Sequence, residues 1–396
     1  MWPVLLLDLA ATTGAATAAA PVQPSATAAA PAPPAAAPGP PWLRQVAERV
    51  DLYGRFDGNI AFTKESLEVA NNGSRFGIRA EQDLPGGLTV LGRGEWSFSL
   101  GQGDTKYNIS ENPHTGFGTF ESTQQQALGA RLGYVGMRFG RFGELTFGKQ
   151  WGVYYDVSIW TDRFVVFGAR STSTYNGGTD GGQTGEGRAD DALAYRVTLG
   201  PLRLGVQAQF MDARSPAVDS VSGSVIAETG GGLRMGVTYS HAFLDVPTAL
   251  PGYDGGDADA LTGGVEFDGA GFRLAALGTW TRNHEIVQGD AASVMYDTLG
   301  ASLFVARRFW GSLMPYAGFD FAVPRGLDTQ FVDADFGTRD LIGGVRWLFD
   351  GREFFSFAYA EARTGRTRDA TGTRAPDAFM LGIRFDYSLR RALGFD

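Results

Sequence analysis

The sequence predicts an all-β protein, a 16-stranded antiparallel transmembrane β-barrel. Two patterns predict this fold: apolar and polar residues alternate with a period of two from residue 50 onward, and short turns alternate with long polar loops. In addition, no window holds the ~18–20 consecutive apolar residues of a transmembrane helix, so any membrane-spanning structure must be made of strands. The mean hydropathy of -0.11 agrees with this, because alternate residues of a barrel strand face water.

The composition suits a large barrel and argues against other classes of function. The chain has 396 residues, a formal net charge of -9, 56 Gly, 12% aromatic residues and 19% charged residues. High Gly and aromatic content suits many twisted strands joined by turns. The acidic balance and the absence of a basic run argue against a nucleic-acid partner. The absence of Cys fits an exported protein without disulfides.

Motifs for catalysis or metal binding are missing from the sequence. It contains no G-x-S-x-G motif, P-loop or Cys nucleophile, so we expect no enzymatic activity. The histidines His114, His241 and His284 are far apart and have no metal-ligand spacing. The segment Asp254–Ala260 (DGGDADA) lacks the spacing and terminal Glu of an EF-hand and is better interpreted as a solvated acidic loop. We therefore expect no metal and no cofactor.

The first 49 residues are interpreted as processing and linker segments. Residues 1–20 contain an apolar VLLL followed by small residues, the pattern of a signal peptide. This signal is atypical, because no Lys or Arg precedes Arg44 and Asp8 interrupts the apolar region. A disordered Ala-rich N-terminus is the alternative. Residues 21–49 form a Pro/Ala-rich linker and a short helix, and residues 50–396 form the barrel.

The strands are identified by alternation between two faces. In Val50–Phe62, Val, Leu, Phe and Ile alternate with Asp, Tyr, Arg and Asn, as expected for a strand with one apolar and one wet face. The same pattern recurs in residues 74–84, 188–199 and 377–387. Any one of these strands could belong to a soluble sandwich, which would place its apolar face inside.

The connections favour the membrane barrel. Seven short turns are interleaved with eight long polar loops, which gives sixteen strands, an even number as bacterial outer-membrane barrels require. The turns lie at residues 85–87, 141–143, 200–201, 229–232, 268–271, 308–310 and 350–352, and the loops near 63–73, 101–124, 152–187, 212–216, 244–258, 284–293, 324–337 and 365–376. The strand at Val218–Ala227 has the poorest alternation and is assigned to preserve this order. Short turns would face the periplasm and long loops the exterior.

Several stretches in order resemble the trimeric general porins of Gram-negative outer membranes. They are LYGRFDG, SRFGIRAEQDLPGGL, RLGYVGMRFGRFGELTFGKQWGVYYD, TDRFVVFG and GRADDALAYR, which together cover about residues 50–200. The resemblance implies a third loop folded into the barrel, a homotrimer, and a pore for small hydrophilic solutes and ions. It also implies export through the periplasm to the cell outer membrane, where lipid and lipopolysaccharide would surround the protein.

The resemblance implies a constriction with a basic wall opposite an acidic loop. Matched by motif, the wall residues are Arg55, Arg75, Arg131 and Arg188. Alternation independently places Arg55, Arg75 and Arg188 on the polar face, and it places Arg131 opposite Leu128, Ala130, Leu132 and Tyr134. Asp162 matches the acidic residue of the loop. Arg163 follows it, and Val166 stands where the family usually has a second carboxylate, so the loop is less acidic than the family pattern.

We expect passive diffusion through a water-filled pore, with weaker cation selectivity than a doubly acidic loop would give and a slight anion preference. Two alternatives stay open. A substrate-specific channel for a sugar or an anion could use an aromatic slide made of Trp151, Tyr154, Tyr155 and Trp160. A non-conducting barrel could serve adhesion or envelope anchoring, with each arginine paired to a carboxylate inside a plugged interior.

Overall fold

The computed structural model describes residues 40–64, 66–98, 105–107, 120–122, 128–168, 170–172, 184–211, 218–244, 250–288, 293–349 and 356–393. The expected signal peptide, the linker as far as residue 39 and the turn at 350–352 lie outside these residues. Of the predicted loops, most of 101–124 also lies outside them, as do residues 173–183 of the third loop and residues 212–216.

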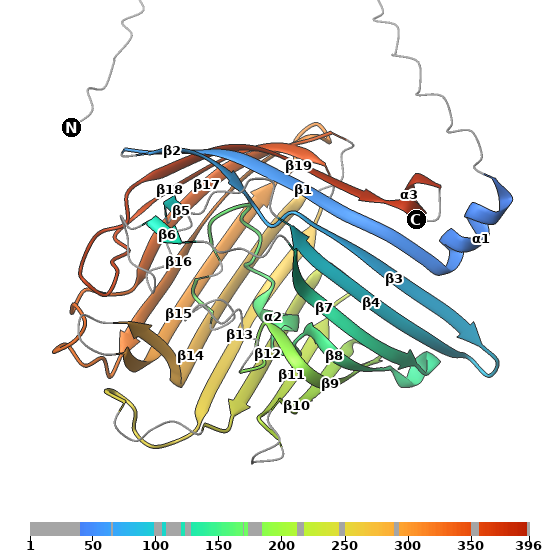
Figure 1. The fold of residues 1–396 in the computed structure, drawn as a ribbon, viewed down its shortest axis with the longest axis horizontal. Helices are drawn as coiled ribbons and strands as arrows, with labels where there is room; N and C mark the ends of the chain where they lie inside the picture. The colour runs from blue at the N-terminus through green and yellow to red at the C-terminus, as the bar shows by residue number, and fades with distance from the viewer. Residues whose placement is uncertain are drawn as a thin grey trace, which may run out of the picture. The chain divides into compact units, whose positions relative to one another are not determined.

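One antiparallel sheet of seventeen strand segments forms the barrel (Figure 1). The segments are β1 (Val50–Thr63), β2 (Leu67–Asn71), β3 (Arg75–Leu84), β4 (Leu88–Phe98), β7 (Leu128–Arg138), β8 (Glu144–Trp151), β9 (Arg188–Leu199), β10 (Leu202–Gln209), β11 (Ser220–Glu228), β12 (Leu233–Ala242), β13 (Ala258–Gly269), β14 (Phe272–Gln288), β15 (Ser293–Arg307), β16 (Leu313–Arg325), β17 (Thr338–Leu348), β18 (Phe357–Gly365) and β19 (Ala378–Ser388). From β3 onward, each segment of the sheet pairs with the next one along the chain. β1 pairs with both β2 and β3 on one side and with β19 on the other, which closes the sheet.

Four short helices and a small hairpin complete the described elements. The helices are α1 (Pro41–Arg49), the 3₁₀ turn η1 (Gly140–Phe142), α2 (Tyr155–Ser158) and α3 (Leu389–Ala392). β5 (Thr105–Tyr107) pairs with β6 (Phe120–Ser122) outside the main sheet. None of the described helices is long and apolar enough to cross a membrane.

Segments β2 and β3 are two parts of a single interrupted strand, so the barrel has the sixteen strands that the sequence predicts. Both pair with β1: Gly58 lies opposite Asn71 in β2, and Arg55 lies opposite Arg75 in β3. Between these pairs, β1 has two residues and its partner has three, which is the geometry of a bulge. The predicted long loop at residues 63–73 is therefore wrong, because five of its eleven residues form strand β2.

The two faces of the sheet have the polarity of a membrane barrel. On β1, the outward side chains Leu52, Phe56 and Ile60 are 49%, 44% and 42% exposed. The polar Asp57 and Asn59 on the other face are buried. A soluble protein buries its apolar side chains instead. The exposed apolar face is consistent with contact to lipid, and the polar face lines the interior.

The strand with the poorest alternation in the sequence is present. β11 (Ser220–Glu228) pairs with β10 on one side and with β12 on the other. Its inward residues include the small polar Ser220, Ser222 and Ser224 and the apolar Ile226, all buried. Serine gives little polarity contrast with the outward Val residues, and this explains the weak pattern in the sequence.

Alternation mispredicts the surroundings of Arg131. The pairing of β4 with β7 shifts between Glu95 and Trp96, so that Glu95 lies opposite Leu132 and Trp96 opposite Ala130. Arg131 is the extra residue of this bulge. Leu132 is therefore on the inner face, next to Glu95, and only 2% exposed. Alternation predicts instead that Leu132 faces outward, on the side opposite to Arg131. A bulge shifts the alternation by one residue, and periodicity alone does not reveal it.

A charge on the outward face should destabilise the barrel. Ile383, at the centre of β19, is 59% exposed on that face. We expect Ile383→Lys to lower the free energy of unfolding by about 2–4 kcal/mol, the cost of a Lys near the bilayer midplane. The volume-conserving Ile383→Met should cost less than about 1.5 kcal/mol. Urea unfolding in lipid vesicles measures both, and equal effects of Lys and Met would contradict the assignment of this face to lipid.

Candidate functional site

The segment after β8 turns into the barrel and packs against its inner wall (Figure 1). Helix α2 contacts β11, β12 and β13. Val153, Tyr154, Val157 and Trp160 have no exposed surface. The Tyr154 hydroxyl lies 2.5 Å from Thr262 Oγ1 of β13. These apolar and aromatic residues therefore fill the space between the loop and the wall.

Glycines on the inner wall allow this close approach. A Cβ atom at Gly236 of β12 would come within 2.7 Å of the Trp160 ring. A Cβ atom at Gly300 of β15 would come within 1.8 Å of the Ser171 carbonyl oxygen. No real Cβ occupies such positions, so any larger residue would displace the loop.

Glu361 of β18 holds the far part of the loop. Its buried carboxylate accepts hydrogen bonds from the backbone N–H groups of Val165 (2.6 Å), Val166 (2.8 Å) and Phe167 (2.7 Å). The Tyr316 hydroxyl donates a further bond of 2.6 Å. Charge-assisted hydrogen bonds to a buried carboxylate are strong, and leaving these donors unpaired would be costly. The loop is thus fixed to β18, far along the barrel wall from the strand it leaves.

Other wall residues bind the same loop. The Asn72 side chain, in the bulge between β2 and β3, donates to the Val165 carbonyl (2.8 Å). The Arg170 backbone N–H donates to Asp320 of β16 (3.0 Å). Because these contacts come from separate strands, they fix both the position and the orientation of residues 165–170.

The three residues of the predicted constriction loop, Asp162, Arg163 and Val166, each have defined contacts. Asp162 accepts a hydrogen bond from the Tyr155 hydroxyl (2.6 Å). The Arg163 guanidinium lies 3.6 Å from the Glu266 carboxylate of β13. The backbone carbonyl of Arg163 accepts a hydrogen bond from the Arg346 guanidinium. Val166 is partly buried against the apolar residues behind the loop. The charge of Arg163 is therefore in contact with a carboxylate of the barrel wall.

Two of the predicted wall arginines, Arg75 and Arg131, meet at one carboxylate. Glu95 of β4 lies 3.0 Å from Arg131 Nε, 2.8 Å from Arg93 Nη2 and 3.8 Å from Arg75 Nε. The Tyr53 hydroxyl donates to the same carboxylate (2.9 Å). Arg93 was not predicted. Its place on the wet face could have been found, because Arg93 and Glu95 are two residues apart on one strand.

A third predicted arginine, Arg55, lies next to this group. Arg55 and Arg384 both bind Asp386, at 2.8 and 2.7 Å. Five guanidinium groups (Arg55, Arg75, Arg93, Arg131 and Arg384) thus contact two carboxylates, which leaves a formal charge of +5 − 2 = +3. We call these seven residues the arginine wall. It borders a polar cavity of about 420 Å³ that Arg79, Arg390 and Arg391 also line.

The fourth predicted arginine, Arg188, lies on β9. Arg188 is the first residue of β9, opposite Trp151 of β8, and its guanidinium is 5.9 Å from the centre of the Trp151 ring. Like Arg131 and Arg384, it is not among the residues that line the polar cavity. The pairing of β8 with β9 shifts between Gly148 and Gln150, so alternation is not a guide to the direction of Arg188.

A second basic group lies behind the loop. Glu266 of β13 contacts Arg163, Arg234 and Arg273. Asp156 of α2 binds Arg196 (2.8 Å) and Arg203 (3.4 Å). Here too guanidinium groups outnumber carboxylates, so a positive potential extends over more of the interior than motif matching indicated.

The acidic segment at Asp254–Ala260 is largely paired within the protein. Arg282 lies 3.1 Å from Asp254, and His241 lies 2.9 Å from Asp259. Hydrogen bonds from Asn283 and from the Gly256 backbone hold the pKa of the Asp254 carboxyl below its usual range. Protein cations and amides thus provide the partners of these carboxylates.

Comparison with known proteins agrees with this architecture. The Gram-negative porin family matches residues 9–393. The chain is 32% identical over 251 residues to outer membrane protein F of Serratia marcescens, which is 59% of this chain and 60% of that protein. It is 25% identical over 358 residues to outer membrane porin PhoE of Klebsiella pneumoniae, which is 86% of this chain and 92% of that protein.

Solved structures show the same fold. Salmonella typhi OmpF in complex with daunomycin superimposes with a TM-score of 0.69 at 20% identity, covering 85% of this chain and 97% of that one. The trimer form of OmpT from Vibrio cholerae gives a TM-score of 0.61 at 16% identity, covering 85% and 99%. The match of the family along nearly the whole chain, together with the closed sixteen-stranded barrel, leads to one conclusion: the chain belongs to the Gram-negative porin family.

Proposed function

We propose that the protein forms a water-filled pore in the outer membrane, through which small hydrophilic solutes and ions diffuse passively. The observation that carries the proposal is the polarity of the barrel, with exposed apolar residues outside and an arginine wall inside. An excess of guanidinium groups is costly unless water or counter-ions solvate it. A hydrated interior therefore fits the arginine wall better than a fully plugged one.

In this proposal, the loop from residue 152 narrows the pore opposite the arginine wall. Arg55, Arg75 and Arg131 supply the positive side, joined by Arg93. Asp162 supplies the negative side, and Val166 leaves the loop with one carboxylate fewer than the family pattern. Low-dielectric walls strengthen the field between the two sides, so polar solutes can align their dipoles while apolar ones gain nothing. Arg188 of β9 is the fourth basic residue of this proposed positive side.

The positive charge of the arginine wall favours anions over cations at this part of the path. The arginine wall carries a formal +3, and further arginines surround Glu266 and Asp156. This supports a slight anion preference despite the net charge of -9 for the whole chain. A sugar-specific channel is less well supported, because Tyr154 and Trp160 of the suggested aromatic slide have no exposed surface and cannot contact a solute.

Conductance separates the pore from the non-conducting alternative. The purified protein in a planar bilayer should give stepwise single-channel currents. Insertion of intact barrels without any current steps would refute the pore and favour an anchoring role.

We also propose that the protein is a homotrimer surrounded by outer-membrane lipid and lipopolysaccharide. The similarity of its fold to the trimer form of Vibrio cholerae OmpT motivates this proposal. Native mass spectrometry of the purified protein tests the stoichiometry.

Removing one charge from the arginine wall should weaken anion preference. Arg75→Gln is suitable because Glu95 keeps Arg93 and Arg131 as partners. A unit charge about 7 Å from a passing ion changes its energy by about 0.6 kcal/mol in water, with opposite sign for an anion and a cation, and salt at about 0.1 M roughly halves this effect. We therefore expect the anion-to-cation permeability ratio to fall about two- to threefold. Reversal potentials in a KCl gradient measure this ratio.

The matched control for that experiment is Arg282→Gln, because Arg282 is paired with Asp254 and Asp259 away from the arginine wall. It should leave the ratio unchanged. Strong cation selectivity of the unmodified protein, or equal effects of the two variants, would contradict the proposed role of the wall.

Weakening the contact at Glu361 should release the loop. In Glu361→Gln, an amide group replaces one of the two oxygens that accept the N–H bonds of Val165, Val166 and Phe167. Leaving a buried donor unpaired costs about 1–3 kcal/mol. We expect noisier open-channel current with frequent closures, recorded from single channels in a bilayer. Glu144→Gln is the control, because Glu144 binds Arg138 near a short turn. Quiet channels in Glu361→Gln would show that this carboxylate does not hold the loop.

A further inference from the structure

The polar cavity inside the barrel extends from the arginine wall toward the end that carries the short turns. Its volume of about 420 Å³ is within the range of about 300–1,000 Å³ that small-ligand sites have. Six arginines line it together with the carboxylates of Asp51, Glu95 and Asp386, so the formal charge of the lining is +6 − 3 = +3. The inward loop contacts the wall deeper in the barrel, where Asn72 donates to the Val165 carbonyl. The cavity therefore lies on the short-turn side of that loop.

An inner group of three lining arginines belongs to the arginine wall. Arg55, Arg75 and Arg93 each lie 2.8–3.8 Å from a carboxylate of Asp386 or Glu95. These carboxylates partly neutralise the inner group, which keeps an excess of one positive charge over the two carboxylates that it contacts. The inner end of the cavity is thus positive, and its guanidinium groups are held in place by the wall.

An outer group, Arg79, Arg390 and Arg391, lies nearer the short-turn end. Arg79 comes four residues after Arg75 on β3, so their Cα atoms are about 13 Å apart. The Arg79 guanidinium lies 5.3 Å from the centre of the Tyr53 ring. Among the residues that the structure describes, no carboxylate forms an ion pair with Arg79 or Arg390. The outer group therefore has guanidinium groups available for an anionic ligand.

The backbone of helix α3 is fixed to the barrel wall. The Ser388 side chain accepts a hydrogen bond from the Arg391 backbone N–H (3.3 Å) at the start of this helix. Asp51 of β1 accepts hydrogen bonds from the Ser388 hydroxyl (2.8 Å) and from the Arg390 backbone N–H (3.2 Å). Because these bonds tie α3 to β1, they keep Arg390 and Arg391 beside the cavity.

We propose that the cavity is a saturable binding site for a small solute with two separated anionic groups, such as a sugar bisphosphate. One anionic group binds the outer arginines, whose planar guanidinium groups can each donate two parallel hydrogen bonds to a phosphate. The excess charge of the inner group attracts the second one. A solute with a single anionic group uses only one end of the cavity. This inference rests on the proposed pore and names the class of solute that the pore binds best.

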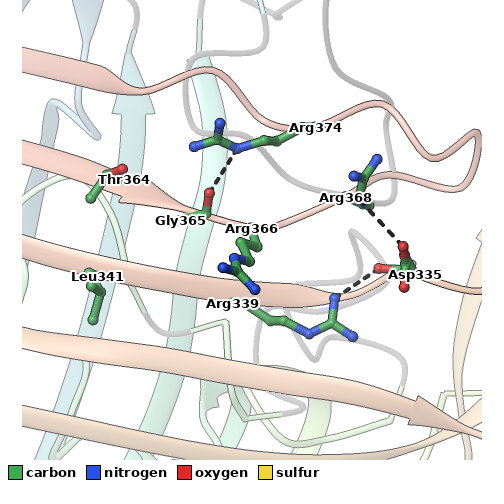
Figure 2. A pocket seen from close by; sticks show the side chains of 8 residues that line it. All are labelled: Asp335, Arg339, Leu341, Thr364, Gly365, Arg366, Arg368 and Arg374. Carbon is green, nitrogen blue, oxygen red and sulfur yellow. Dashed lines mark hydrogen bonds and ion pairs between the residues drawn. The ribbon is translucent and has the colours of Figure 1, made fainter. Parts of the chain in front are cut away.

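A larger basic pocket lies outside the path through the barrel, on the outward face of β17 and β18 (Figure 2). Its volume is about 930 Å³. Its Arg374 donates to the Gly365 carbonyl (2.8 Å), and its Arg368 lies 3.9 Å from the Asp335 carboxylate. Because a solute inside the barrel does not contact this pocket, Arg374 is a suitable control residue.

Isothermal titration calorimetry of the purified full-length protein in detergent tests the proposal. The probes are fructose 1,6-bisphosphate, fructose 6-phosphate and fructose, and the affinity should fall in that order. Arg390→Gln and Arg79→Gln should each weaken binding of the bisphosphate about tenfold or more, the scale of a hydrogen bond to a charged group. Arg390→Lys keeps the charge but loses the planar fork, so it should weaken binding less than Arg390→Gln.

Two arginines outside the cavity provide the controls. Arg141 is exposed at a short turn, 5.0 Å from the centre of the Phe142 ring, and does not line the cavity. Arg141→Gln and Arg374→Gln remove the same charge as the test variants. Both should bind the bisphosphate as the unmodified protein does.

Single-channel currents in KCl give a second measurement. Because the cavity lies on one side of the inward loop, the bisphosphate should interrupt the current more often when it is added to one side of the bilayer. The interruptions should reach a maximal frequency as its concentration rises, and they should be shorter in Arg390→Gln.

Four results would overturn the inference. They are equal affinities for the bisphosphate and the monophosphate, unchanged affinity in both Arg390→Gln and Arg79→Gln, loss of bisphosphate binding in the presence of an equal concentration of inorganic phosphate, and KCl currents without measurable bisphosphate binding. The last result would leave the proposed pore intact, so failure of the binding site and failure of the pore can be told apart.

Discussion

Strand β1 pairs with β19 from Tyr53–Ser388 to Thr63–Ala378, and this pairing closes the sheet. In a membrane, an open sheet edge would leave backbone N–H and C=O groups unpaired at a cost of several kcal/mol each, so the barrel depends on this closure. The same pairing brings Arg55 of β1 beside Asp386 and Arg384 of β19. Closure of the barrel and assembly of the arginine wall are therefore one structural event.

The carboxylates of the interior bind two kinds of partner, guanidinium groups and backbone N–H groups. Glu95 and Asp386 bind guanidinium groups and reduce the repulsion among neighbouring arginines. Glu361 and Asp320 bind backbone N–H groups of the inward loop. Because a buried charge is costly without partners, each carboxylate needs the group it binds, and the loop and wall stabilise each other. Rigidity of the narrowed region follows from these contacts and not from regular secondary structure.

Much of the fold was predictable, because lipid on one side and water on the other produce a two-residue period. Arg55 and Arg75 lie beside the polar cavity, on the face that this period assigns to them. Arg131 shares Glu95 with Arg75, but alternation gave it the wrong neighbours, because a bulge shifts the register at this residue. A register shift also precedes Arg188, so alternation does not give the direction of its side chain. The contact between Glu361 and Val166 links residues 195 positions apart, and no local pattern encodes such a pair.

The bulge between β2 and β3 has a consequence for how this chain can change during evolution. Its extra residue lets Asn72 reach both Asp57 and the inward loop, while Leu67 and Val69 of β2 stay on the outward face. Deleting one residue here would reverse the faces of β2, turning Leu67 and Val69 inward and Glu68 toward lipid. Insertions and deletions should therefore accumulate in the long loops of related sequences and be rare at residues 72–74, although this short segment looks like an ordinary Asn-Gly turn.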